Sequence, residues 1–148
     1  MAINGRVYDW ESINIHLPHG EVIGVQDIEY GDKFGHERVY GKGSLPIGYG
    51  RGNYEAEGKV TLLRDEYDKL VEHAKNVEGG FYAMEPFPIT VAYANKDDEV
   101  KSVTLPDCIW VERKNSASQG ATSLTVELNF LILSPIEEDG LKAYAPRR

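Results

Sequence analysis

The sequence predicts a mainly β protein of the α+β class: an antiparallel β-sandwich or barrel with one flanking α-helix and a long extended loop. Three observations support this prediction. Several segments alternate apolar and polar residues with a period of two, which is typical of half-buried strands. One segment carries an apolar stripe at helical spacing. A polar, glycine-rich stretch at residues 31–52 exceeds the usual length of loops in compact domains.

Length and composition indicate a single folded domain over residues 1–148, with 41% hydrophobic and 27% charged residues. The formal net charge of −8 argues against a grip on nucleic acid or an anionic membrane, because phosphates are bound by Lys and Arg. DNA sliding past without sticking remains compatible with this charge. The chain shows no membrane-spanning apolar run and no signal-peptide pattern, so we expect folding in a reducing cytoplasm.

The first strands are predicted in residues 12–31, as a pair joined by a turn at residues 18–20. Alternation is poor in residues 22–30, so the sequence does not determine which face of that strand points inward. It is regular again in residues 53–63. There the small or apolar face comprises Tyr54, Ala56, Gly58, Val60 and Leu62, and the other face Glu55, Glu57, Lys59 and Thr61.

A helix is predicted at about residues 65–76 and ends at the glycines of residues 79–80. Asp65 is its expected N-cap, and Glu66 and Asp68 suit the positive end of the helix dipole. Its apolar stripe comprises Leu63, Tyr67, Leu70, Val71 and Ala74.

The second half of the chain is predicted to be β again. Residues 87–95 and 101–113 flank a turn at residues 96–99, and residues 114–123 form a polar hairpin tip. The last strand places Glu127 and Asn129 on its polar face. Its apolar face comprises Leu124, Val126, Leu128, Phe130 and Ile132. Residues 134–148 lack periodicity and predict a C-terminal arm or frayed end.

No motif predicts catalysis, a metal or a cofactor. The stretch Gly41-Lys42-Gly43-Ser44 fails as a phosphate loop, because Gly43 separates Lys from Ser and a strand follows instead of a helix. The only cysteine, Cys108, excludes an internal disulfide and has no adjacent base, so we expect a buried structural thiol. The histidines are expected on the surface or in loops: His16, His19, His36 and His73.

The acidic alternation has two interpretations. Glu55, Glu57 and Glu127 belong to a solvated outer face, since antiparallel sheets often face water on one side. Alternatively they form a negative wall that repels DNA and lets it pass, a wall that Asp27, Glu29 and Glu112 extend.

Residues 51–70, RGNYEAEGKVTLLRDEYDKL, run from an alternating strand with small and acidic residues directly into the helix. With the order of the surrounding elements over residues 10–135, this stretch resembles the tail tube proteins of contractile-tailed bacteriophages, which are related to type VI secretion and phage-like injection tubes. The resemblance implies a non-enzymatic structural virion protein without cofactors. Its hexameric rings stack into a tube inside a sheath, above a baseplate, and DNA passes through the lumen without specific binding. The implied location is the virion tail, after assembly in the host cytoplasm.

The resemblance also implies residue roles. The lumen-facing residues would be Glu55, Glu57, Lys59, Glu127 and Asn129. The ring-stacking loop would carry Lys33, Arg38, Lys42, Pro46, Tyr49 and Arg51, whose basic side chains suit acidic patches on the next ring. Lys59 departs from a purely negative lumen.

Three other functions remain open. The chain also suits the tube of a phage-like injection device. A small β-barrel that binds a ligand or carbohydrate, with residues 31–52 as its lip, belongs to a different class. An enzyme on the same barrel ranks last, because the sequence shows no nucleophile–base pair.

Overall fold

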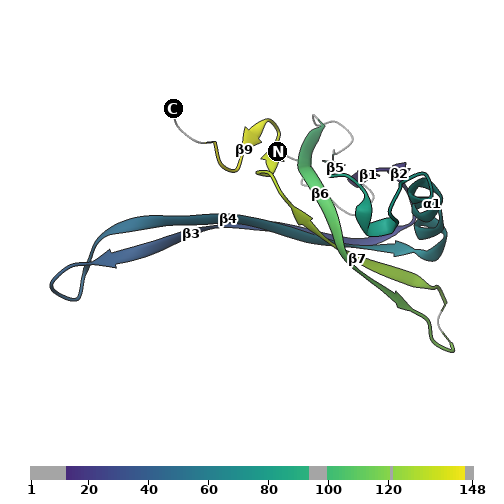
Figure 1. Cartoon of the computed structure of the whole chain (residues 1–148), viewed down its shortest axis with the longest axis horizontal. Helices are drawn as coiled ribbons and strands as arrows, with labels where there is room; N and C mark the ends of the chain where they lie inside the picture. The colour runs from purple at the N-terminus through teal and green to yellow at the C-terminus, as the bar shows by residue number, and fades with distance from the viewer. Residues whose placement is uncertain (1–12, 94–99, 121, 146–148) are drawn as a thin grey trace, which may run out of the picture.

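The computed structural model describes residues 13–93, 100–120 and 122–145 (Figure 1). Within this part of the chain there is one α-helix, α1 (Arg64–Ala74), and one 3₁₀ turn, η3 (Phe81–Ala83). The strands are β1 (Ile13–Leu17), β2 (Gly20–Val22), β3 (Val25–Tyr40), β4 (Pro46–Leu63), β5 (Phe87–Tyr93), β6 (Lys101–Ser116), β7 (Thr125–Ile132), β8 (Glu137–Glu138) and β9 (Leu141–Lys142). The mainly β class with a single flanking helix is therefore confirmed.

The strands form one antiparallel sheet in the order β2-β1-β5-β6-β7-β4-β3, so β2 and β3 are its edges. Strand β6 changes partner along its length. Residues 101–108 pair with β5, and residues 108–116 pair with β7. The short β8 pairs with β6 and with β9.

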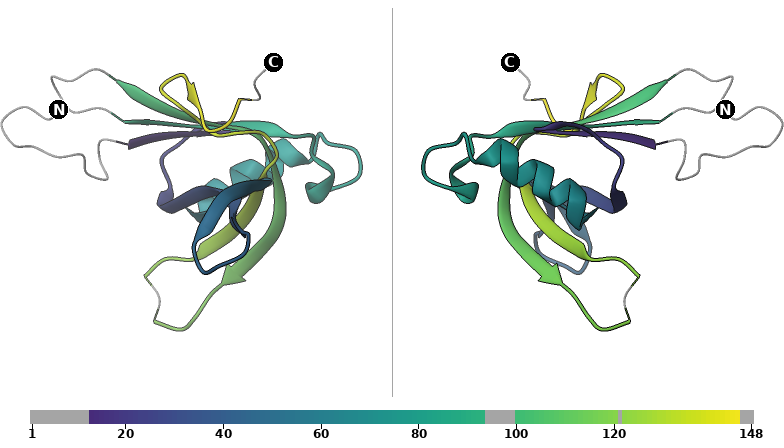
Figure 2. Two further views of the ribbon diagram at one scale, coloured as in Figure 1. Left: turned by 90° about the vertical axis from the view of Figure 1, so that its left-hand side faces the viewer. Right: turned by 90° about the vertical axis from the view of Figure 1, so that its right-hand side faces the viewer.

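The core lies on one face of the sheet, which α1 covers (Figure 2). Alternate residues of β4 and β7 point into it, as the period-two pattern predicts. Trp110 packs its ring against Phe87 and Phe130 at centroid distances of 5.0 Å and 5.9 Å. The helix contributes Tyr67, Leu70 and Ala74. Leu124, expected on this apolar face, precedes β7 and is 48% exposed.

Residues 31–52 differ from the predicted loop. They continue β3 and β4 as a two-stranded ribbon that extends well beyond the body, and only residues 41–45 form a turn (Figure 1). Both faces of the ribbon are solvent-exposed, so neither strand needs the apolar alternation that marks a half-buried strand. Two interruptions in register, after Phe34 and after Val39, accommodate the glycine-rich sequence.

The helix begins one residue earlier than predicted, and Asp65 is not its cap. Leu63 occupies the N-cap position and makes no side-chain capping bond. Neighbouring segments hold this end by their backbones instead. Leu63 N–H donates to the carbonyl of Gly24 at 2.7 Å, and Arg64 N–H donates to that of Leu124 at 3.0 Å.

The C-terminal segment is not a frayed end over its described residues. Ile136 is buried in the core, and β8 and β9 form a small hairpin that turns at Asp139 and Gly140, both with positive φ. A few long-range contacts hold this segment, which explains why its sequence shows no periodicity. Residues 146–148 of the predicted arm and the predicted turn at 96–99 lie outside the described residues.

Candidate functional site

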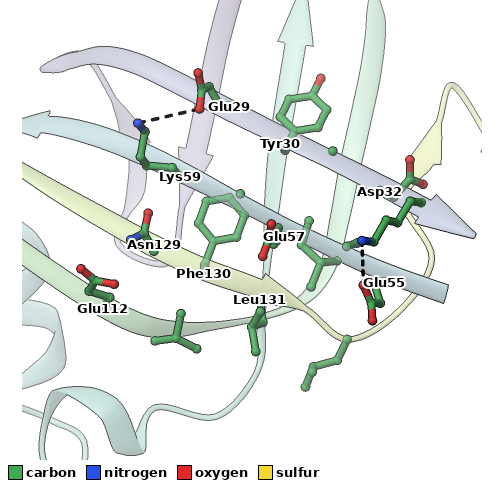
Figure 3. Close-up of a pocket in the computed structure, with 17 residues that line it drawn as sticks. Glu29, Tyr30, Asp32, Glu55, Glu57, Lys59, Glu112, Asn129, Phe130 and Leu131 are labelled. Atoms are coloured by element: carbon green, nitrogen blue, oxygen red, sulfur yellow. Dashed lines mark ion pairs between the residues drawn. The ribbon is translucent and has the colours of Figure 1, made fainter. Parts of the chain in front are cut away.

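One face of the four-stranded section β3-β4-β7-β6 is polar, and we call it the polar face (Figure 3). Register places the five predicted lumen residues, Glu55, Glu57, Lys59, Glu127 and Asn129, together on it. The face carries six acidic and three basic side chains, a formal charge of −3. They are Asp27, Glu29, Glu55, Glu57, Glu112 and Glu127 against Lys33, Lys59 and Lys114.

Ion pairs partly neutralise the negative charge of the polar face. The Nζ atom of Lys59 lies 3.8 Å from a carboxylate oxygen of Glu29 and 3.8 Å from one of Glu127. Lys33 and Glu55 form a second pair at 3.4 Å. All these groups are at least one-third exposed, so each pair contributes little to stability. Lys59, the exception to a purely negative set of predicted lumen residues, therefore pairs with two acidic side chains.

The polar face is hollowed into a broad open concavity of about 1130 Å³. On β3 and β4 its lining is mostly acidic, with Lys33 and Lys59 among the acids, and on the β6–β7 side polar and apolar residues are mixed. The exposed apolar residues of that side are Val111, Leu131 and Leu133, with exposed fractions of 45%, 38% and 56%. The concavity is open to solvent and is not an enclosed cavity.

The ribbon of residues 33–53 extends past the last β4–β7 pair and is called the arm. It contains four basic residues and one acidic residue, a formal charge of +3, which leaves −11 on the rest of the chain. The predicted stacking residues all lie on it: Lys33 at its base, Lys42 in the turn, and Arg38, Pro46, Tyr49 and Arg51 on its strands. Its tip is also apolar, with Tyr40, Leu45, Ile47 and Tyr49 between 54% and 79% exposed.

The C-terminal hairpin braces the base of the arm. The Tyr54 hydroxyl donates to Asp32 at 2.6 Å and accepts the N–H of Ile136 at 3.1 Å. Burial, followed by the bond to Asp32, raises the pKa of Tyr54 to about 12. The ring of Tyr144 packs on Phe34 at a centroid distance of 4.8 Å. The C-terminal segment thus contacts the base of the arm through residues of both β3 and β4.

A buried carboxylate holds the opposite end of the body. Glu66 is 5% exposed, and it accepts from His19 Nε2 at 3.2 Å and from the N–H groups of Ile23 and Gly24 at 3.4 Å and 3.5 Å. Burial alone raises the pKa of Glu66, but these bonds and the charge of Lys69 outweigh it and hold the pKa below its ordinary value.

His19 is consequently not the surface histidine that the sequence predicts. Its side chain is only 7% exposed, and its second ring nitrogen is buried without a hydrogen-bond partner among the described residues. No local signal indicates this contact, because 47 residues separate His19 from Glu66.

Cys108 is a buried free thiol, as the sequence predicts. Burial raises the pKa of the Cys108 thiol to about 12, and its Sγ donates to the carbonyl of Leu105 at 3.1 Å. Among the described residues no group of three or more His, Cys, Asp or Glu side chains is arranged to hold a metal ion. The helix in this part of the chain is too short and too polar to cross a membrane.

The curved sheet, flanking helix and long hairpin form a fold that this chain shares with solved structures from a contractile injection system and a gene transfer agent particle. Comparison with protein-family models and with curated proteins found no match to the sequence. Among solved structures, the chain is similar to one from the sheath/tube terminator of the PVC extracellular contractile injection system, with a TM-score of 0.64 and 7% identity, covering 93% of this chain and 99% of that one.

Two further structures share the fold. Hcp1 from Flavobacterium johnsoniae matches with a TM-score of 0.55 and 12% identity, covering 90% of this chain and 98% of that one. A chain of the native gene transfer agent virion matches with a TM-score of 0.52 and 11% identity, covering 88% of this chain and 97% of that one. The resemblance seen in residues 51–70 is thus confirmed at the level of the fold.

Proposed function

We propose that this chain is the tube subunit of a contractile tail or a related injection device, without enzymatic activity. Six copies form a ring, rings stack into a tube, and the polar faces line its channel. The tube contacts a sheath and a baseplate and belongs to the particle's tail. The observation that carries this proposal is a pair of unsatisfied sheet edges that match each other.

These two edges bound the four-stranded section that carries the polar face. The outer edge of β3 pairs with no other strand in the described chain, and neither does the β6 edge opposite β7 over residues 109–116. The β6 edge over residues 109–116 is as long as the eight-residue β4–β7 ladder, and residues 25–32 of β3 lie opposite that ladder with the same length. Exposed edges of this length invite pairing with another chain, and a closed ring satisfies all of them.

Strand direction supports the same closure. The four strands alternate in direction, so β3 and β6 run antiparallel. A β3 edge placed beside the β6 edge of the next copy therefore makes one more antiparallel pair and leaves the polar face on one side throughout. With −3 per copy, six copies give the channel wall a formal charge of −18. Such a wall repels nucleic acid and lets it pass.

Cross-linking between copies tests the ring. We would replace Glu29 on β3 and Glu112 on β6 by cysteine in one chain and add a short bis-maleimide. The buried Cys108 thiol should stay unreactive. The expected product is a ladder of covalent multimers that ends at the hexamer. The control pairs Glu29→Cys with Glu72→Cys on the exposed side of α1, where no ladder is expected. A chain that is monomeric by mass photometry and gives no ladder would refute the proposal.

A second function, a small binding module, rests on the concavity in the polar face. Its open form and the presence of an apolar-tipped arm favour assembly over ligand binding. Saturable ligand binding by a strictly monomeric chain would favour the module. A phage tube and an injection-device tube differ in what passes through them. Nuclease-protected DNA in purified particles would identify a phage tube.

A further inference from the structure

A single carboxylate ties two turns of the chain to the helix at one edge of the sheet. Glu66 of α1 accepts a hydrogen bond from His19 Nε2 in the β1–β2 turn, and it accepts the N–H groups of Ile23 and Gly24 in the β2–β3 turn. The two turns flank β2, the edge strand next to α1 (Figure 1). We call residues 18–24 the β2 segment.

Few other contacts hold the β2 segment. Within the described chain β2 pairs only with β1, over three residues, and Val22 is the one residue of the segment that belongs to the core. Gly24 lies so close to Glu66 that an added Cβ would overlap the Cγ atom of Glu66. The Gly24 carbonyl also accepts the N–H of Leu63 at 2.7 Å, a bond that does not involve Glu66. Loss of the Glu66 contacts would therefore free residues 18–23 and leave the start of β3 attached.

The contact between His19 and Glu66 is nearly closed to solvent. Each side chain is 7% exposed, and Nδ1 of His19 has no hydrogen-bond partner among the described residues. Two charged or titratable groups of the described chain face the carboxylate, His19 from the β1–β2 turn and Lys69 from α1, whose Nζ atom lies 3.5 Å away. The polar groups of this site are therefore matched only while Glu66 is an anion.

Acid reverses this match at both partners. Burial raises the pKa of Glu66, but the bonds from His19, Ile23 and Gly24 and the charge of Lys69 outweigh it, so the anion persists at neutral pH. In acid the carboxyl group takes up a proton and the imidazole gains a second N–H. His19 and Lys69 are then two cations beside an uncharged carboxyl group. A buried imidazolium without a counter-ion is costly, and it reaches water only if the β1–β2 turn moves away.

We propose that Glu66 and His19 form an acid-sensitive latch: in acid the β2 segment leaves the edge of the sheet while the rest of the subunit stays folded. Opening removes Val22 from the core and uncovers the backbone groups of β1 that now pair with β2, which leaves a new sheet edge for another strand. The proposal does not depend on the tube function, because β2 lies outside the four-stranded section β3-β4-β7-β6.

Hydrogen exchange of the wild-type chain, followed by mass spectrometry, tests the latch. Amide protection factors, which correct for the effect of pH on intrinsic exchange, would be compared at about pH 7 and about pH 3. Protection in residues 18–24 should fall by about 10–100-fold at the lower pH, as expected for the loss of two or three hydrogen bonds. Residues 101–108, in the β5–β6 ladder, should stay protected. Unchanged protection of residues 18–24, or an equal loss in both regions, would overturn the proposal.

Three variants separate the roles of the two partners, and the wild-type pH series stands even where a variant fails to fold. Glu66→Gln keeps the shape of the side chain without its charge, so its β2 segment should already be open at neutral pH. His19→Gln keeps a donor but cannot gain a charge, so its acid opening should be smaller than that of wild type. Glu72→Gln, on the exposed side of α1, is the control and should change neither. Wild-type protection in Glu66→Gln at neutral pH would refute the latch, and full acid opening in His19→Gln would refute the role of His19.

Discussion

Glu66 offers the sharpest test of how this subunit is held together. Replacing it by alanine leaves three partly buried donors without their acceptor: the N–H groups of Ile23 and Gly24, and Nε2 of His19. The distances of 3.2–3.5 Å lie at the long end for such bonds, so we take about 1 kcal/mol for each. Glu66→Ala should therefore lower the free energy of unfolding by about 3 kcal/mol. For a chain of this length, that loss lowers Tm by about 6–12 °C.

The assay is urea denaturation followed by circular dichroism, with Tm from calorimetry as a second measurement. Glu72→Ala is the matched control, because Glu72 lies on the same helix and pairs with Lys75 at 2.7 Å, but both side chains are about two-thirds exposed. The control should cost less than about 0.5 kcal/mol. Equal losses for the two variants would show that the Glu66 hydrogen bonds contribute nothing to the net stability.

The same site predicts a pH dependence. The pKa of Glu66 is held below its ordinary value of 4.5, so folding favours the ionised form. Its contribution is then complete above the unfolded-state pKa and is lost as the pH falls through the lower folded-state pKa. The stability difference between wild type and Glu66→Gln should be constant from about pH 7 to pH 5 and should shrink below about pH 4. A difference that persists unchanged at pH 3 would contradict this reasoning.

Three other outcomes follow from local geometry. Gly58→Ala should destabilise by about 1–3 kcal/mol in urea denaturation, because the added Cβ would lie 2.5 Å from the Phe130 ring and 2.7 Å from the Glu29 carbonyl, whereas Gly48→Ala, with open space around it, should not. Tyr54→Phe should cost about 1–3 kcal/mol and speed amide exchange at Ile136, since the variant loses one bond to a carboxylate and leaves that N–H unpaired; unchanged exchange would contradict the brace. Native Cys108 should resist Ellman's reagent at pH 8 and react after unfolding, and rapid native labelling would show that the thiol is accessible.

The sequence predicts those parts of the fold that a local pattern specifies. The alternation of Glu55, Glu57 and Lys59 with small or apolar residues predicts both strand β4 and its polar face, because a half-buried strand must alternate. The apolar stripe of α1 is predicted because a helix that packs on a core carries apolar residues along one side, and Tyr67 and Leu70 are indeed buried. Register then brings the predicted β7 residues onto the same face.

The remaining features depend on contacts between distant residues. The arm has no buried face, so nothing in its sequence selects strand over loop until β3 and β4 pair. Ile136 is buried, and its N–H donates to the hydroxyl of Tyr54, which is 82 residues away in the sequence. Glu66 holds the β2–β3 turn from 42 residues away. Local sequence patterns do not indicate which distant residues will be in contact.

The change of partner along β6 affects how the subunit unfolds. Its first half is hydrogen-bonded to β5 and its second half to β7, with Cys108 in both ladders. The β1-β2-β5 wing and the β3-β4-β7 section therefore share one continuous strand, and neither can separate without disrupting it. We expect the two parts to melt in a single cooperative transition, with the slowest amide exchange of the chain near Cys108. Tension applied to either part would then reach the other through a single covalent backbone.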